Sequence, residues 1–141
     1  MSQQHPLIID CHGHYTTAPK ALEQWRNRQI AGIADPAQMP KASELKISDD
    51  ELRESIETNQ LRLMRERGSD LTIFSPRASF MAHHIGDFQV SSTWAALCNE
   101  QCHRVAQLFP DHFIGVAMLP QSPGVDPATC IPELEKCVNE Y

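Results

Sequence analysis

The chain has 141 residues, of which 41% are hydrophobic and 21% charged, and its formal net charge is −6. This length fits one ordinary domain, and the apolar share is enough for a packed core, so global disorder is excluded. A net-acidic chain with no stripe of Lys and Arg lacks the electrostatic footprint that phosphate binding requires, which excludes a simple nucleic-acid role. No run of about 18 apolar residues occurs, so we expect no membrane span.

The five cysteines have irregular spacing and form no Cys-x-x-Cys motif; they are Cys11, Cys98, Cys102, Cys130 and Cys137. The first residues contain neither a cationic start nor an apolar signal core. We therefore expect free thiols in a soluble protein of the cytoplasm.

The first predicted element is a short strand at Leu7–Ile9, directly before Asp10. The run is too short for a helix and does not alternate, so it predicts a strand buried on both faces. Prolines and a glycine interrupt residues 15–47, where only 21–30 could form about two helical turns. Long loops of this kind are usually functional or disordered, so we expect a lid-like insertion after the first strand.

A capping box of Ser48 and Glu51 predicts the start of a helix, and Gly68 predicts its end. Buried strands are predicted at 71–75 and 113–119, each closed by a proline. A second helix, capped by Ser91 or Ser92, lies between them. A third, capped by Thr129 with a proline in its first turn, follows.

Buried strands that alternate with amphipathic helices indicate an α/β protein with parallel strands. Three such units form either half of a doubly wound sheet or the opening of a (β/α)8 TIM-like barrel. A complete barrel needs about 250 residues. In the barrel interpretation, residues 1–141 form a single partial domain, apparently truncated, that holds the first three βα units.

The residues with the clearest chemistry follow the first strand: Asp10, Cys11, His12, Gly13 and His14. Side chains two apart in an extended segment point the same way, so His12 and His14 can present two imidazoles to one ion. Two neutral imidazoles suit zinc or another divalent ion, and catalytic residues gather at the carboxyl ends of parallel strands. Asp10 either bonds backbone amides at the turn or orients a ligating imidazole.

The segment Ile8–Tyr15 resembles the opening strand of the metal-dependent amidohydrolase superfamily, in the branch of aminocarboxymuconate-semialdehyde decarboxylase and related decarboxylases and hydratases. Five later stretches are similar to the hydratases of that branch that act on 4-oxalomesaconate. They are 47–51, 59–63, 66–68, 72–79 and 118–123. The Ser-Pro-Arg-Ala-Ser stretch within 72–79 is far more specific than His-x-His, and the resemblance covers almost the whole chain.

The resemblance implies a zinc-dependent barrel enzyme of aromatic-acid breakdown that adds water to 4-oxalomesaconate, a small anionic oxo-carboxylate. It also implies that His12 and His14 are the first two metal ligands. We further expect a homo-oligomer. The family takes a further histidine and an acid from later strands. The remaining ligands and the general acid–base are therefore expected beyond Tyr141.

A tricarboxylate substrate calls for a cation near the strand ends. Arg77 could hold a carboxylate with two parallel hydrogen bonds, or it could form a surface salt bridge. Ser75 could contact the substrate or complete a turn, and Tyr15 could bond the substrate or pack in the core. For the adjacent His83 and His84 we favour an exposed or substrate-edge role over a second metal site.

Fold and metal do not fix the reaction. A metal-dependent decarboxylase, or a hydrolase of C–C or amide bonds on the same scaffold, is the alternative enzyme. A catalytically silent fragment is the alternative of a different class.

Overall fold

The computed structural model describes residues 6–77 and 81–141. Its centre is a sheet of three parallel strands in the order β1-β2-β3, with β1 at Ile9–Gly13, β2 at Leu71–Phe74 and β3 at Phe113–Gly115. The parallel α/β arrangement predicted from the sequence is therefore confirmed.

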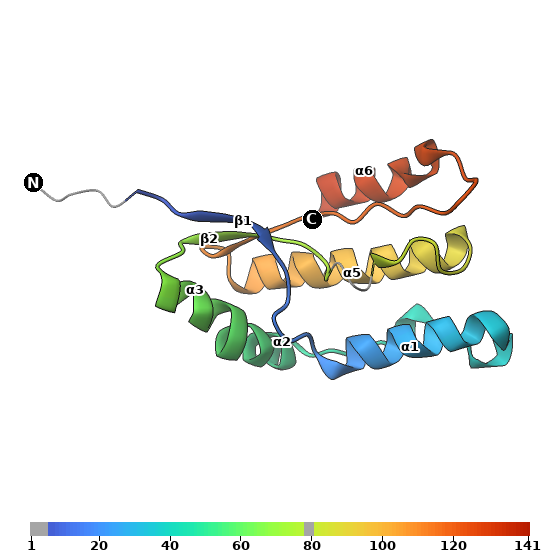
Figure 1. Cartoon of the computed structure of the whole chain (residues 1–141), viewed down its shortest axis with the longest axis horizontal. Coiled ribbons are helices and arrows are strands. Elements are labelled where there is room, and N and C mark those ends of the chain that lie inside the picture. The colour runs from blue at the N-terminus through green and yellow to red at the C-terminus, as the bar shows by residue number, and fades with distance from the viewer. Residues whose placement is uncertain (1–5, 78–80) are drawn as a thin grey trace, which may run out of the picture.

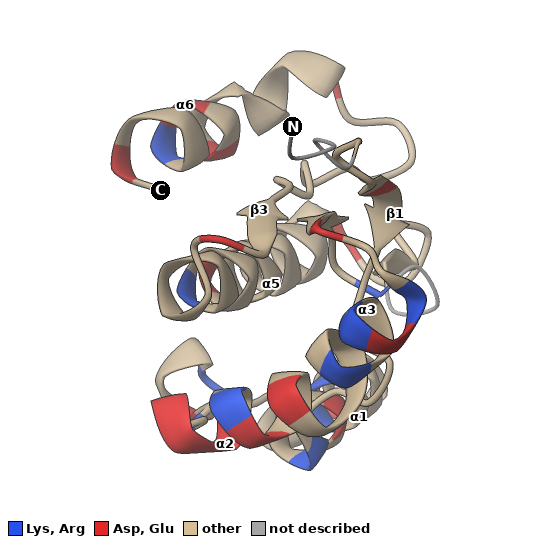
Figure 2. Ribbon diagram, turned by 90° about the vertical axis from the view of Figure 1, so that its left-hand side faces the viewer, with Lys and Arg blue, Asp and Glu red and all other residues tan. Residues whose placement is uncertain are grey.

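Helices precede and follow each later strand, and Figure 1 shows them with their labels. The helices are α1 (Lys20–Ala34), α2 (Asp49–Ser55), α3 (Arg62–Arg67), α5 (Phe88–Leu108) and α6 (Ile131–Glu140). A π-helical turn, Ile56–Leu61, joins α2 to α3, and short 3₁₀ turns lie at Pro36–Gln38, Ala42–Glu44 and Pro127–Cys130. Figure 2 shows α1, α2, α3 and α5 below the strands and α6 above the level of β3. In the part of the chain that is described, no helix is long and apolar enough to cross a bilayer.

The core lies between the sheet and the helices on its lower side. Thr72, Phe74 and Phe113 are each 2% exposed or less, and they alternate with more exposed neighbours along their strands. Phe74 of β2 packs edge-on against Phe113 of β3, and α5 packs against β3. This one-sided burial follows from the period of two in a strand.

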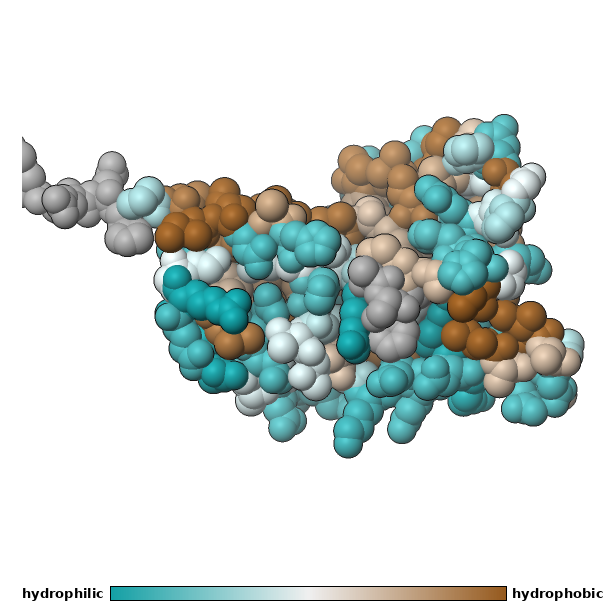
Figure 3. Space-filling model, viewed as in Figure 1, coloured by the Kyte–Doolittle hydropathy of each residue, from teal (hydrophilic) through white to brown (hydrophobic). Residues whose placement is uncertain are grey.

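The prediction that the first strand is buried on both faces is wrong for this chain. Ile8 and Ile9 are 43% and 47% exposed, and Ile114 of β3 is 52% exposed. These strands are the two edges of the sheet, and no layer among residues 6–77 and 81–141 covers the face opposite the helices. Figure 3 shows the resulting hydrophobic surface over β1 and over α6.

The third strand is shorter than the predicted range 113–119. Beyond Gly115, the Asn99 side chain rather than a neighbouring strand bonds the backbone of Met118. Asn99 of α5 accepts a hydrogen bond from the backbone N–H of Met118 at 2.6 Å and donates one to its carbonyl at 2.9 Å. Both backbone groups are thereby satisfied without a neighbouring strand.

The segment 15–47 is largely helical, in contrast to the loop with two helical turns that the sequence predicts. Helix α1 runs for 15 residues and continues through Gly32, where an added Cβ would lie 2.7 Å from the Cα of Met39. The glycine is thus used for close packing of the chain that returns after α1. Trp25 of α1 stacks on Trp94 of α5 with ring centroids 6.0 Å apart, and this pair fixes α1 against α5.

The helix ends show where local signals were sufficient. The capping box of Ser48 and Glu51 and the left-handed Gly68 (φ 69°) are present as predicted. Helix α5 begins earlier than predicted, because the Asp87 carboxylate accepts from the N–H of Val90 at 2.9 Å. Asp126, rather than Thr129, caps the 3₁₀ turn before α6, with its carboxylate 2.9 Å from the N–H of Ala128.

The double hydrogen bond of Asn99 gives a stability prediction. Asn99→Ala leaves a buried N–H and a buried carbonyl without partners, at about 1–3 kcal/mol for each orphaned group. We expect the free energy of unfolding, measured by chemical denaturation, to fall by at least about 2 kcal/mol. Asn139→Ala, at an exposed position of α6, is the matched control and should change it by less than about 0.5 kcal/mol. Equal effects of the two substitutions would contradict the role of Asn99.

Candidate metal centre

Two imidazoles lie close together at the carboxyl end of β1. The rings of His12 and His14 have centroids 6.0 Å apart and planes inclined by 80°. Metal–nitrogen bonds of about 2.0–2.1 Å place the centroids of two imidazoles on one ion roughly 5–6 Å apart. A separation of 6.0 Å therefore lets the two rings approach one ion with little rearrangement.

The hydrogen bond of His14 selects the nitrogen that is open to a metal. Its Nδ1 lies 3.1 Å from the carbonyl oxygen of Tyr15. A carbonyl only accepts, so Nδ1 carries the proton and Nε2 presents its lone pair. This is the arrangement by which a backbone carbonyl commonly orients a metal-ligating histidine.

The backbone around the two histidines is held by hydrogen bonds formed by Asp10 and Ser75. Asp10 accepts a hydrogen bond from the N–H of His12 at 3.0 Å, which is the amide-binding alternative proposed for it. Ser75 donates to the carbonyl of Gly13 from both its N–H, at 2.8 Å, and its hydroxyl, at 3.0 Å. The ends of β1 and β2 are thereby joined at the residue between the two imidazoles.

Gly13 is required by the close approach of the two strands. A Cβ at this position would lie 1.9 Å from the Cγ2 of Thr72, a distance that no packed structure tolerates. The pairing register also contains one extra residue of β1 between Asp10 and Gly13, which marks a bulge. Bulges commonly re-aim side chains beside active sites.

Arg77 and Tyr15 both line a small enclosed cavity behind the strand ends. Arg77 is exposed overall, whereas Tyr15 is 3% exposed and packs edge-on against Phe74 with centroids 4.9 Å apart. Burial raises the pKa of the Tyr15 phenol far above its ordinary value, so it stays neutral. Its hydroxyl has no hydrogen-bond partner among residues 6–77 and 81–141. The end of the Ser-Pro-Arg-Ala-Ser stretch, Ala78 and Ser79, lies outside the described residues.

The ligand set present in this chain is partial. Among residues 6–77 and 81–141, no group of three or more His, Cys, Asp or Glu side chains could hold a metal ion. The Nε2 of His14 fits a ligand role, and the closeness of His12 fits a pair. A catalytic zinc normally takes three protein ligands.

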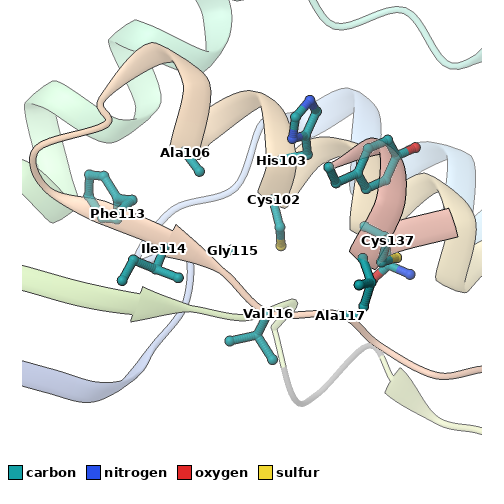
Figure 4. A pocket seen from close by; sticks show the side chains of 12 residues that line it. Cys102, His103, Ala106, Phe113, Ile114, Gly115, Val116, Ala117 and Cys137 are labelled. Carbon is teal, nitrogen blue, oxygen red and sulfur yellow. The ribbon is translucent and has the colours of Figure 1, made fainter. Parts of the chain in front are cut away.

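Two further features of the described residues do not involve this pair: a contact of His83 and a groove along β3. His83 contacts the hydroxyl of Ser91 through Nδ1 at 3.2 Å, and His84 is exposed. A groove of about 490 Å³ lies along β3, where α5 and α6 face each other (Figure 4). Its lining includes the side chains of Cys102, Val116 and Cys137 and contains neither His12 nor His14.

Sequence reasoning missed the side chains that hold the segment after His14. Thr16 donates a hydrogen bond from its hydroxyl to the Oε1 of Gln60 at 2.6 Å, and the hydroxyl of Ser55 donates to the carbonyl of Thr17. Both partners lie about 40 residues away in sequence. One sequence signal could have indicated the widened turn that carries Gln60. The apolar Ile56 and Leu61 are five residues apart, a spacing that an unbroken α-helix does not place on one face.

Residues 9–141 match the amidohydrolase family Amidohydro_2, and the chain belongs to this family. The family is consistent with a pair of histidines at the end of the first strand of a parallel α/β fold.

Two hydratases and one decarboxylase are the most useful comparisons for this chain. The chain is 58% identical over 134 residues to a 2-keto-4-carboxy-3-hexenedioate hydratase of Sphingobium sp., covering 95% of this chain and 39% of that protein. It is 78% identical to the 4-oxalomesaconate hydratase LigJ of Rhodopseudomonas palustris, whose crystal structure superposes with a TM-score of 0.90 over 96% of this chain and 40% of that one. A dihydroxybenzoic acid decarboxylase of Polaromonas sp., solved with bound manganese, is 26% identical, with a TM-score of 0.54 over 96% and 36% of the two chains. The chain thus spans about 40% of the length of its hydratase relatives.

The contact of Gly13 with Thr72 gives a second prediction. Gly13→Ala forces β1 away from β2 and should lower the free energy of unfolding by about 1–3 kcal/mol, the usual cost of overpacking. Thr72→Ser removes the clashing methyl and keeps the hydroxyl, so the double variant should regain part of the loss relative to Gly13→Ala.

Gly115→Ala in the neighbouring β3 is the matched control, because its Cβ would meet no atom closer than 3.5 Å. Chemical denaturation of the four proteins tests the argument. A Gly13→Ala protein as stable as the Gly115→Ala protein would contradict it.

Proposed function

We propose that this chain is the amino-terminal part of a zinc-dependent hydratase that adds water to the carbon–carbon double bond of 4-oxalomesaconate. The observation that carries the proposal is the 78% identity to the hydratase of R. palustris over 96% of this chain. The pair of His12 and His14, with a tautomer suited to a ligand, gives the match a chemical basis.

His12 and His14 would hold the metal through their ring nitrogens, with Nε2 as the ligating atom of His14. A bound zinc ion supplies Lewis-acid polarisation of substrate oxygens or a water activated near neutral pH. Asp10 and Ser75 would act on the backbone, since Asp10 accepts a hydrogen bond from the N–H of His12 and Ser75 donates one to the carbonyl of Gly13.

Arg77 is the residue of this chain that we propose to bind a substrate carboxylate. It follows β2 at the same end of the sheet as the histidine pair, and a guanidinium can form two parallel hydrogen bonds with a carboxylate. For Tyr15 and Ser75 we propose support of the site, because the Tyr15 ring packs in the core and the Ser75 hydroxyl is engaged by Gly13.

A metal-dependent decarboxylase is the second candidate, and the manganese-bound decarboxylase of Polaromonas sp. supports it. The lower identity of that relative, 26% against 78%, favours the hydratase.

We propose the cytoplasm as the location, since the five cysteines are free thiols and such thiols persist in reducing compartments. We also propose a homo-oligomer, which sedimentation of the full-length protein would test.

The histidine assignment is tested by His12→Ala and His14→Ala in the full-length protein. Loss of groups that only orient ligands costs about 10–100-fold, so loss of a direct ligand should lower kcat/KM by more than about 100-fold and remove zinc. The measurements are the decay of the enol absorbance of 4-oxalomesaconate and the zinc content. His112→Ala, at the amino end of β3 and thus at the opposite end of the sheet, is the control and should leave both unchanged. A parent protein that holds zinc but leaves 4-oxalomesaconate unchanged would contradict the hydratase.

The Arg77 assignment predicts a selective effect on substrate binding. Hydrogen bonds to charged groups contribute about 1.5–3 kcal/mol, so Arg77→Ala should raise KM for 4-oxalomesaconate about 10–100-fold. Arg77→Lys keeps the charge but not the paired geometry, so it should recover only part of this loss. Arg67→Ala, at the exposed end of α3, is the control. An unchanged KM in the Arg77→Ala protein would exclude carboxylate binding by this residue.

A further inference from the structure

The helix between residues 49 and 67 contains a π-helical turn, Ile56–Leu61, in its middle. The buried apolar positions of this helix are Leu52, Ile56, Leu61 and Met64, with successive spacings of four, five and three. The wide turn accommodates the spacing of five and keeps all four side chains in the core. Such turns are rare, and they are frequently found at functional sites.

Side chains of the turn satisfy its backbone. Thr58 donates from its hydroxyl to the carbonyl of Glu54 at 2.6 Å, and Asn59 donates from its amide to the carbonyl of Ser55 at 3.1 Å. Arg62 donates from Nε to the carbonyl of Thr58 at 3.0 Å. Each bond reaches four residues back, so the sequence of the turn supports its widened geometry.

Because of the widened turn, Gln60 faces Thr16 in the segment that follows the histidine pair. In an unbroken α-helix, residue 60 would take the buried position four residues after Ile56. Leu61 takes that position instead, and Gln60 is left half-buried beside Thr16. Gln60 accepts the Thr16 hydroxyl at 2.6 Å, and Ser55 donates its hydroxyl to the carbonyl of Thr17, so two consecutive residues are tied to one helix.

These ties act on the group that orients His14. The Tyr15 carbonyl accepts from the Nδ1 of His14, and the Tyr15 ring is fixed in the core against Phe74. Thr16, the next residue, is tied to Gln60. On the other side of His14, Gly13 is held by Ser75. The position of the imidazole therefore depends on β2 before it and on the π-helical turn after it.

We propose that Gln60 and Ser55 are positioning residues for His14: through Thr16 and Thr17 they fix the Tyr15 carbonyl, and so keep the His14 proton on Nδ1 and its Nε2 directed to a metal ion. The proposal rests on the proposed function only in treating His14 as a ligand. The role of Gln60 requires an acceptor oxygen, which Glu also provides and Ala does not.

The tautomer of His14 in the metal-free protein is the direct readout. Histidine ¹⁵N–¹H correlation spectra at about pH 8, above the ordinary histidine pKa, separate the two neutral forms. The parent and Gln60→Glu proteins should show the Nδ1–H form of His14. Thr16→Val, Gln60→Ala and Ser55→Ala should show a mixture. Glu57→Ala is the control, because it changes an exposed residue of the same turn that takes no part in the ties to Thr16 and Thr17. If Thr16→Val, Gln60→Ala and Ser55→Ala all showed only the Nδ1–H form of His14, the proposal would be overturned.

Metal affinity gives a second readout. The apparent Kd for Co²⁺, measured by competition with a chelator, should rise about 10-fold in Thr16→Val and Gln60→Ala, the lower end of the range for groups that orient ligands. Thr16 and Gln60 act through one hydrogen bond. The double variant Thr16→Val, Gln60→Ala should therefore bind Co²⁺ no more weakly than either single variant. Additive losses, or a loss in Gln60→Glu equal to that in Gln60→Ala, would overturn the proposal. Neither measurement uses 4-oxalomesaconate, so a protein that passes both but does not hydrate it would refute the proposed reaction alone.

Discussion

The contact between the ends of β1 and β2 is the constraint on which the candidate site depends. Gly13 comes so close to Thr72 that no side chain fits between the strands, and Ser75 donates two hydrogen bonds to the Gly13 carbonyl. These contacts between neighbouring strands fix the peptide between His12 and His14. The two imidazoles are thus placed by backbone geometry, which tolerates less displacement than a flexible side chain would.

The second support comes from helices that sequence reasoning treated as a loop. Helix α1 packs on α5 through the stacked Trp25 and Trp94, and the guanidinium of Arg26 lies 4.9 Å from the Trp94 ring centroid. Arg26 is 1% exposed, and burial lowers its pKa. This packing, together with the π-helical turn, holds the segment after His14 from two directions. The segment 15–47, although interrupted by prolines, therefore packs as helical structure beside the histidine pair.

The exposed face of the sheet explains several differences from the predicted burial. Ile9, Ile114 and Val116 have the apolar character of strands covered on both sides, and their exposed fractions are 47%, 52% and 36%. The chain spans about 40% of the length of its hydratase relatives. The sequence pattern of these strands fits a second covering layer that residues 6–77 and 81–141 do not supply.

The sequence by itself determined the order of strands and helices and the caps at Ser48 and Gly68, because each depends on residues close together in the chain. It also placed His12 and His14 at the carboxyl end of the first strand. Tertiary structure decided the rest. The length of α1 depends on Met39 packing against Gly32, and the early end of β3 depends on Asn99. The His14 tautomer depends on a carbonyl whose position is held by residues about 40 positions away. Periodicity cannot report such contacts, because they form only when distant segments pack together.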